Sequence, residues 1–355
     1  MIAGRALCPA RLEPIFSPRP WGARTLAPLF PDKSNLAEPL GEAWLTGNEC
    51  RFASGPFAGK NLGEVWPDIS VDWAGTQINT HDGAFPLLVK FIFAQQKLSV
   101  QVHPDDAYAS LHEKSAGGRG KTEMWYVVDA QPGAEVLVGL EPSVTPEIFK
   151  HAITGESVED CLQHIPLRPG DTMFVPAGTT HTIGAGLVLC EIQQNSDLTY
   201  RVYDYNRRDA SGKPRELHLE KAFDVIRFGE QRGGKVAPVT IERAGVKKTF
   251  LAACPYFATE RWHFNSPVST STAPEHFELW IVIEGTGSIR WSNESAQFAP
   301  AQVWLIPAAL GAFTIIPESS ATFLRTYVPH SLAAIAENLV REGVRENDAA
   351  RLVFP

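Results

Sequence analysis

Short apolar segments recur along this chain of 355 residues, and glycine or proline separates most of them from the next. They are rich in valine, isoleucine, leucine and aromatic residues and too short for helices, so they predict β-strands. The predicted strands cover Leu87–Ala94, Leu98–Val102, Met124–Val128, Glu135–Leu140, Thr172–Val175, Leu187–Gln193, Thr199–Tyr203, Phe250–Ala253, Phe277–Ile283, Gly287–Trp291, Val303–Ile306, Phe313–Ile316 and Thr322–Tyr327. The hydrophobic pattern therefore predicts a mainly β protein.

Helical spacing is confined to a few segments. Thr145–Thr154 begins with a capping threonine followed by proline, which is a good signal for the start of a helix. His218–Phe228 and Ser331–Arg341 place apolar residues at i, i+3 and i+4. Gly229–Val239 has no apolar periodicity, so we expect a linker there.

Two landmarks occur twice in the same order. Glu123–Asp129 (EMWYVVD) resembles Glu278–Glu284 (ELWIVIE), and Met173–Pro176 is matched by Trp304–Pro307. The first copy holds about 24 more residues between its landmarks, and these include a predicted helix. Chance similarity is the alternative, but the shared order counts against it. The repeat predicts two related β-barrel units, with a helical insertion near residues 145–163 in the first.

Charge and hydropathy exclude two classes of partner. The chain has 32 basic and 40 acidic side chains, a formal net charge of −8, and no basic run that could follow a phosphate backbone. The best apolar run, Phe85–Ala94, is interrupted by Lys90 and is too short to span a bilayer. Arg5, Pro9 and Arg11 interrupt any signal-peptide core. We therefore expect neither a nucleic acid nor a membrane as a partner.

The cysteines indicate the compartment. There are 5 of them, an odd number, and none forms a C-x-x-C pair. They are Cys8, Cys50, Cys161, Cys190 and Cys254. Reduced, mostly buried thiols in a cytoplasmic protein are the interpretation.

Four side chains form a candidate metal site. Alternation along a strand places Gln101 and His103 on one face, Glu123 opens a later strand, and His181 follows a turn after Pro176. A histidine or a glutamate taken alone is more often structural or solvated. Together, one amide, two imidazoles and one carboxylate suit Zn²⁺, with Mn²⁺, Fe²⁺ or Co²⁺ as alternatives.

The spacing of these residues resembles a known superfamily. Gly170-x5-Pro176-x-Gly178-x2-His181 is similar to the second motif of the cupins, and Gln101-x-His103 with Glu123 is similar to the first. Glutamine in place of the first histidine, in the string Q-V-H-P, resembles the type I phosphomannose isomerases. Further similar segments are Pro20–Gly22, Gly41–Trp44, Phe85–Lys90, Gly120–Trp125 and Asn195–Arg201. Longer members of that family have histidine at the position of Gly120 and a large helical domain in place of the short insertion. In both features this chain resembles the compact bacterial form.

The resemblance implies two cupin-type (jelly-roll) β-barrels and an isomerase that interconverts mannose 6-phosphate and fructose 6-phosphate through an enediol. One divalent ion, with zinc as the first expectation, would be held by Gln101, His103, Glu123 and His181. A small phosphorylated sugar would be the partner, and we expect a monomer.

The same resemblance implies roles for four charged residues. Lys121 and Arg201 would be catalytic, Lys121 as a proton carrier beside the cation and Arg201 through its fork of donors for anionic oxygens. Lys90 and Asp197 would be at the substrate-binding site. Lys90 lies on an apolar run, where a charge needs a reason, and would help to capture the phosphate, and Asp197 would orient Arg201 or assist proton transfer. The alternatives are a solvated Lys121, a turn-capping Asp197, and an Arg201 paired on the surface with Asp204 or Glu191.

The second copy of the repeat lacks the motif chemistry. Aligning its proline with Pro176 places Ala301, Ala309 and Ala312 at the positions of the motif glycines and histidine. We therefore expect a catalytic unit over residues 1–228 and a structural unit over residues 240–355. His276, beside Glu278, is interpreted as a surface histidine.

Two other functions stay open on sequence grounds. One is a cupin metal oxidoreductase or dioxygenase, although such sites favour histidine-rich ligands and Gln101 counts against it. The other is a catalytically silent sugar-phosphate-binding protein. Retention of both metal histidines and the basic residues argues against this second alternative.

Overall fold

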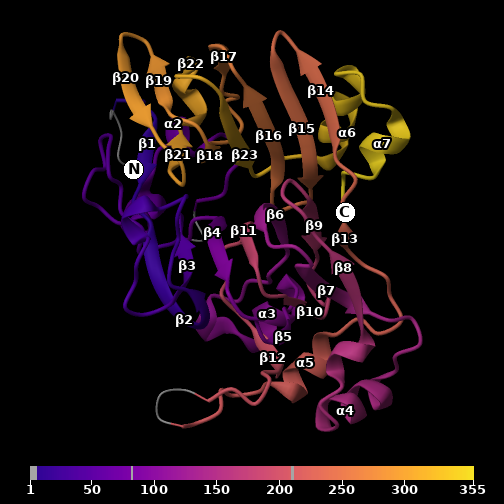
Figure 1. Ribbon diagram of the computed structural model, residues 1–355. Helices are drawn as coiled ribbons and strands as arrows, with labels where there is room; N and C mark the ends of the chain where they lie inside the picture. The colour runs from indigo at the N-terminus through magenta and orange to yellow at the C-terminus, as the bar shows by residue number, and fades with distance from the viewer. Residues whose placement is uncertain (1–5, 81–82, 209–211) are drawn as a thin grey trace.

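The computed structural model describes residues 6–80, 83–208 and 212–355, so Arg5 of the signal-peptide argument lies outside the described residues. Figure 1 shows two β-rich units, one in indigo to magenta and one mainly in orange. All paired strands run antiparallel and form four sheets. The mainly β prediction is confirmed.

The first unit consists of a seven-stranded and a five-stranded sheet. The larger sheet has the order β13 (Gly234–Lys235), β9 (Thr172–Val175), β6 (Glu123–Ala130), β11 (Leu187–Gln194), β4 (Leu87–Ala94), β3 (Leu40–Trp44), β2 (Ile15–Ala23). The smaller sheet has the order β12 (Tyr200–Tyr203), β5 (Val100–Val102), β10 (His181–Ile183), β7 (Glu135–Leu140), β8 (Leu162–Pro166). Side chains from both sheets share one buried cluster, which includes Trp125 and Val138. The two sheets therefore face each other across a common core.

The second unit repeats this arrangement with seven and four strands. Its larger sheet has the order β1 (Ala10–Leu12), β21 (Val303–Ile306), β18 (Glu278–Glu284), β23 (Ala321–Tyr327), β16 (Ala258–Phe264), β15 (Val246–Ala253), β14 (Val239–Arg243). Its smaller sheet has the order β17 (Val268–Ser271), β22 (Ala312–Pro317), β19 (Gly287–Trp291), β20 (Glu294–Phe298). Strand β1, close to the N-terminus, thus belongs to the sheet of the second unit (Figure 1).

Helices are few and lie at the margins. They are α1 (Leu62–Val65), α2 (Val71–Ala74), α3 (Asp106–His112), α4 (Pro146–Thr154), α5 (Leu219–Val225), α6 (Leu332–Arg341) and α7 (Glu346–Ala350). The three predicted helices are confirmed as α4, α5 and α6, and the Thr145 side chain caps α4 by accepting from the backbone of Ile148. No helix of the described residues is long and apolar enough to cross a membrane.

Strand register shows that the two units carry opposite charges at equivalent positions. Lys90 of β4 lies opposite Glu191 of β11, and Glu191 lies opposite the tryptophan of the repeated Glu-x-Trp sequence in β6. In the second unit, Glu260 of β16 lies opposite Arg325 of β23, and Arg325 lies opposite the matching tryptophan of β18. The basic and acidic positions are therefore exchanged between the units.

Arg325 fills the interior of the second unit where the first unit has its candidate metal site. Its guanidinium lies 2.6 Å from a carboxylate oxygen of Glu278 and 3.2 Å from one of Glu260. Burial alone would raise the pKa of Glu278, but Arg325 lowers it below its ordinary value. The carboxylate that corresponds to Glu123 is thus already neutralised by an internal cation.

The structure corrects the expectation that His276 lies on the surface. It is 7% exposed and stacks on Tyr327 with 4.2 Å between ring centroids, so the surface interpretation is wrong. The reason is the docking of its segment on the first unit: the Gln77 amide donates to Glu275, and a Cβ on Gly75 would lie 2.4 Å from the Cα of His276. This contact between units cannot be read from local sequence.

Replacing Arg325 by methionine should destabilise the protein, because it leaves Glu260 and Glu278 buried without a cation. Loss of one partner of such a pair costs roughly 3–5 kcal/mol, which should appear as a lower midpoint in urea unfolding. Arg290→Met, at an exposed position of β19, is the control and should stay within about 0.5 kcal/mol of the parent. Equal stability of the Arg325→Met protein and the parent would contradict this account.

Candidate functional site

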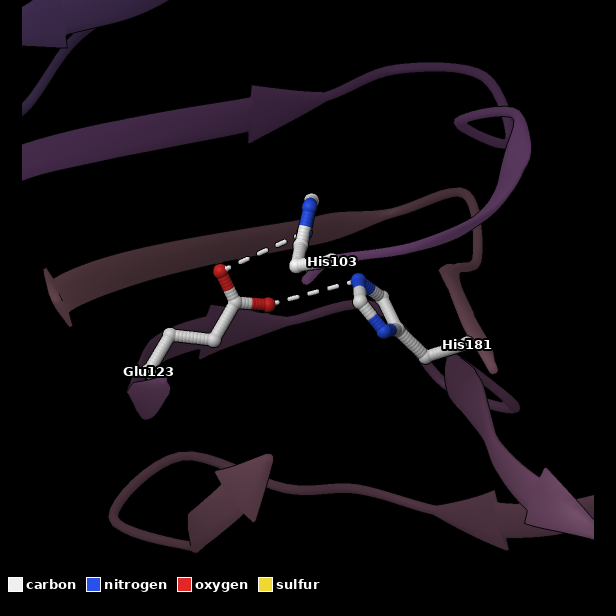
Figure 2. A group of neighbouring side chains, drawn as sticks. All are labelled: His103, Glu123 and His181. Carbon is white, nitrogen blue, oxygen red and sulfur yellow. Dashed lines mark ion pairs between the residues drawn. The ribbon is translucent and has the colours of Figure 1, made fainter. Parts of the chain in front are cut away.

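Three buried side chains meet between the two sheets of the first unit (Figure 2). His103 follows β5, Glu123 begins β6 and His181 begins β10, so each is placed by the end of a strand. Their ligand atoms all lie within 4.8 Å of one another. Glu123 Oε1 is 3.3 Å from His181 Nε2, and Glu123 Oε2 is 3.7 Å from His103 Nε2. The structure thus brings three of the four predicted metal ligands into one cluster.

The backbone fixes the orientation of both imidazoles. Nδ1 of His103 donates to the carbonyl of Leu198 at 2.7 Å, and Nδ1 of His181 donates to that of Thr179 at 2.9 Å. This tautomer leaves the Nε2 lone pairs directed at Glu123. Burial lowers the pKa of both rings, that of His181 to about 4. Both imidazoles are therefore neutral at pH 7, as metal binding requires.

The Glu123 carboxylate is fully buried, and Lys121 is its one cationic partner among the described residues. Neither of its buried oxygens accepts a hydrogen bond of good geometry, although Lys121 Nζ lies 2.7 Å from Oε2. Burial raises the pKa of Glu123 above its ordinary value. A buried carboxylate without adequate partners is costly, and a divalent cation between it and two imidazole lone pairs would remove that cost. The donor set fits such a cation.

Gln101 lies beside the cluster through the pairing of β5 with β10, in which Gln101 is the partner of His181. Its amide Nε2 is 3.3 Å from His181 Nε2. A half-turn of the amide would present Oε1 in the same place, which makes Gln101 available as a fourth ligand.

A polar cavity of about 460 Å³ opens next to this cluster. Its lining includes all of the other residues predicted from the sequence, together with Gln101. These residues are Lys90, Lys121, Asp197 and Arg201. Lys121 connects the cavity with the cluster, since its Nζ is 3.0 Å from His103 Nε2.

The two other predicted cations differ in how their charge is balanced. Lys90 lies 2.9 Å from Glu191 and 3.9 Å from Glu42. Burial alone would lower the pKa of Lys90, but these carboxylates raise it above its ordinary value, so the ammonium stays charged. Lys90 is therefore a cation already paired within the protein.

Arg201 has no such partner. Its Nη1 donates to the carbonyl of Glu216 at 2.9 Å, and its buried Nε has no hydrogen-bond partner. It forms no ion pair with any carboxylate of the described residues, because Glu191 binds Lys90 and Asp204 binds Arg207 and another arginine. The surface-pair alternative is wrong, and the guanidinium is available to an anion in the cavity.

Sequence reasoning missed several residues of this cavity. Glu42 and Glu191 are buried beside Lys90, and Arg19 binds Glu42 at 2.7 Å. Arg215 lines the cavity from the segment after β12 and binds Asp204. The apolar run around Lys90 signalled that a buried partner was needed, but only the register of β4 with β11 identifies Glu191.

Family models of one enzyme family match two separate parts of the chain. The family model for the catalytic domain of type I phosphomannose isomerases matches residues 10–125, and that for the mannose-6-phosphate isomerase cupin domain matches residues 246–328. The probable mannose-6-phosphate isomerase GmuF of Bacillus subtilis is 37% identical over 313 residues, which cover 86% of this chain and 96% of that protein.

Solved structures extend this agreement to the fold. The crystal structure of mannose 6-phosphate isomerase from Bacillus subtilis superposes with a TM-score of 0.81 at 32% identity, covering 90% of this chain and 99% of that one. A mannose 6-phosphate isomerase bound with zinc and yttrium, at 17% identity, superposes with a TM-score of 0.65 over 90% and 99% of the two chains and shares the fold. The expected cupin fold is thereby confirmed. The chain belongs to the type I phosphomannose isomerase family.

Proposed function

We propose that this protein interconverts mannose 6-phosphate and fructose 6-phosphate in the cavity beside the His103, Glu123 and His181 cluster. The observation that carries the proposal is the convergence of buried ligand atoms at one end of a cavity that also holds an arginine without a carboxylate partner. Relatives at 35–37% identity are named mannose-6-phosphate isomerases, which supports this substrate pair.

One divalent cation, zinc in the first instance, would be held by His103, Glu123 and His181 with Gln101 as the fourth ligand. When bound, it supplies a Lewis acid for the sugar oxygens O1 and O2. The imidazoles are neutral and preoriented, so they can bind without losing protons. The carboxylate supplies negative charge, and neither of its oxygens has a hydrogen-bond partner of good geometry.

Lys121 is proposed to carry the proton. Its Nζ lies between the ligand cluster and the cavity, so a sugar whose O1 and O2 rest at the cluster places C1 and C2 near the amine. Lys121 takes the proton from C2, and the resulting enediolate receives it back at C1. The hydroxyl proton of O2 passes to O1, so the aldose becomes the ketose without net gain or loss of protons.

Arg201 is proposed to stabilise the anionic part of the substrate, either the developing enediolate or the phosphate. The buried Nε of its guanidinium has no hydrogen-bond partner, and an anion in the cavity would supply one and balance the buried charge. Lys90 and Asp197 are proposed to bind sugar hydroxyls. Because Glu191 and Glu42 already balance Lys90, it can act as a donor at a fixed position.

Removing either histidine should abolish both metal binding and turnover. We expect about one divalent ion per chain by elemental analysis of the parent, and little metal in His103→Ala or His181→Ala, since loss of one ligand severely weakens a site. Treatment of the parent with EDTA should stop fructose 6-phosphate formation, and one added-back metal should restore it. His164→Ala, an exposed histidine, is the control. Full metal occupancy in both site variants would refute the assignment.

Arg201→Ala should keep its fold and metal while kcat/KM falls on the order of 10² or more, comparable to losing one charge-stabilising donor. Arg201→Lys should recover only part of this loss, because the charge is kept but the planar fork is not. Steady-state kinetics on metal-loaded enzyme provide the measurement. Arg168→Ala, on the exposed surface, should match the parent. Parent-like kinetics in Arg201→Ala would remove this residue from the active site.

A further inference from the structure

The backbone that carries Lys121 is held at three consecutive amides. The Gly120 N–H donates to Asp106 Oδ1 at 2.7 Å, and the Lys121 N–H donates to the carbonyl of Pro104 at 3.0 Å. The Thr122 N–H donates to Oε1 of Gln194 at 2.9 Å. The position of the lysine therefore depends on the two side chains, Asp106 and Gln194, that bind the flanking peptides.

Gly120 itself makes this arrangement possible. A Cβ at this position would lie 2.6 Å from the backbone of Asp105 and Asp106, at the start of α3. The absence of a side chain lets the peptide approach the Asp106 carboxylate directly. A larger residue could not stand at position 120 without moving the start of α3.

Asp106 is hydrogen-bonded to Gln194 and also to a residue of the second unit. Gln194 Nε2 donates to Asp106 Oδ1 at 3.0 Å. The phenol of Tyr256 donates to Asp106 Oδ2 at 2.8 Å. Tyr256 lies in the turn between β15 and β16, which is closed by a 2.8 Å hydrogen bond from Cys254 N–H to the Phe257 carbonyl. A residue of the second unit thus fixes the carboxylate that fixes the Lys121 peptide.

This link crosses an open space between the units. Asp106, Gln194 and Tyr256 all line a cavity of about 580 Å³ that has walls from both units. Asp106 and Tyr256 are half-buried there, so their hydrogen bond bridges a cleft and is not embedded in a packed core. Loss of the phenol oxygen would remove one of the three hydrogen bonds that hold the carboxylate, without opening a cavity in the hydrophobic core.

We propose that Tyr256 is a positioning residue for the isomerisation, acting through Asp106 on the peptide of Lys121. The second unit, which closes its own interior with Arg325, thereby takes part in catalysis by the first. The inference rests on the proposed function for the role of Lys121. Its structural half, that Tyr256 holds residues 120–122, can be tested without any turnover.

The test is Tyr256→Phe in the full-length, metal-loaded protein. Hydrogen–deuterium exchange of peptides covering residues 120–122 should become faster than in the parent. The kcat with mannose 6-phosphate should fall about 10-fold, the scale of rate loss from a modestly misplaced group, while KM and metal content change less than about two-fold. The primary isotope effect with substrate deuterated at C2 should rise, because proton transfer limits the rate more strongly.

Matched variants separate this role from a general loss of structure. Tyr327→Phe removes a phenol oxygen from the same unit at a residue that does not contact Asp106, and should match the parent in exchange, kcat and isotope effect. Asp106→Asn, which weakens the acceptor for both Tyr256 and Gly120, should reproduce the effects of Tyr256→Phe.

The outcomes are distinct. Unchanged exchange at residues 120–122 in Tyr256→Phe would overturn the proposal outright. Faster exchange with parent-like kcat, or a fall in kcat with an unchanged isotope effect, would show that the link is structural and would overturn its role in proton transfer. If the parent formed no fructose 6-phosphate, the proposed function would fail instead, and the exchange result alone would still decide whether Tyr256 holds this backbone.

Discussion

The first unit depends on a fully buried carboxylate, Glu123, whose one cationic partner in the described part of the chain, Lys121, also lines the polar cavity. Glu123 enters the space between two sheets at the start of β6, where it is fully buried. Its neighbours there are Lys121 Nζ at 2.7 Å and two imidazole nitrogens with free lone pairs. Backbone carbonyls hold those lone pairs toward it. Burying a charge in this way is strongly unfavourable unless a cation is shared among the groups. The geometry is therefore that of a ligand set.

The second unit shows the other solution to the same constraint. Glu278 occupies the position of Glu123, and one guanidinium, that of Arg325, binds both Glu278 at 2.6 Å and Glu260 at 3.2 Å. This cation is a side chain of the protein, so the interior of the second unit needs no bound ion. The acidic and basic positions are exchanged between the pair β4 and β11 and the pair β16 and β23, and Ala312 stands at the motif position of His181.

Sequence reasoning succeeded where local pattern decides the structure. The interior strands β4, β7 and β9 were predicted to the residue because they are short apolar runs bounded by turn residues. Strand β10 was missed because His181 and Thr182 are polar although fully buried, and β2 was missed because two prolines and an arginine interrupt it. The ligand set was found because its spacing forms a motif.

What the sequence could not reveal depends on contacts between distant segments. Glu191 became part of the cavity only through the register of β11 with β4, and Tyr256 reached Asp106 only through the packing of two units. The prediction that His276 lies on the surface was wrong for the same reason, because backbone contacts with the segment around Gly75 bury this residue.

The central claim is that one cation belongs to the first unit and that an arginine takes its place in the second. Anomalous diffraction from crystals of the protein, recorded at the zinc absorption edge, tests it most directly. The account predicts one strong peak among His103, Glu123 and His181, with Gln101 Oε1 turned toward it, and none beside Glu278. A peak beside Glu278 and Arg325, or no peak among the three ligands in zinc-supplemented crystals, would contradict it.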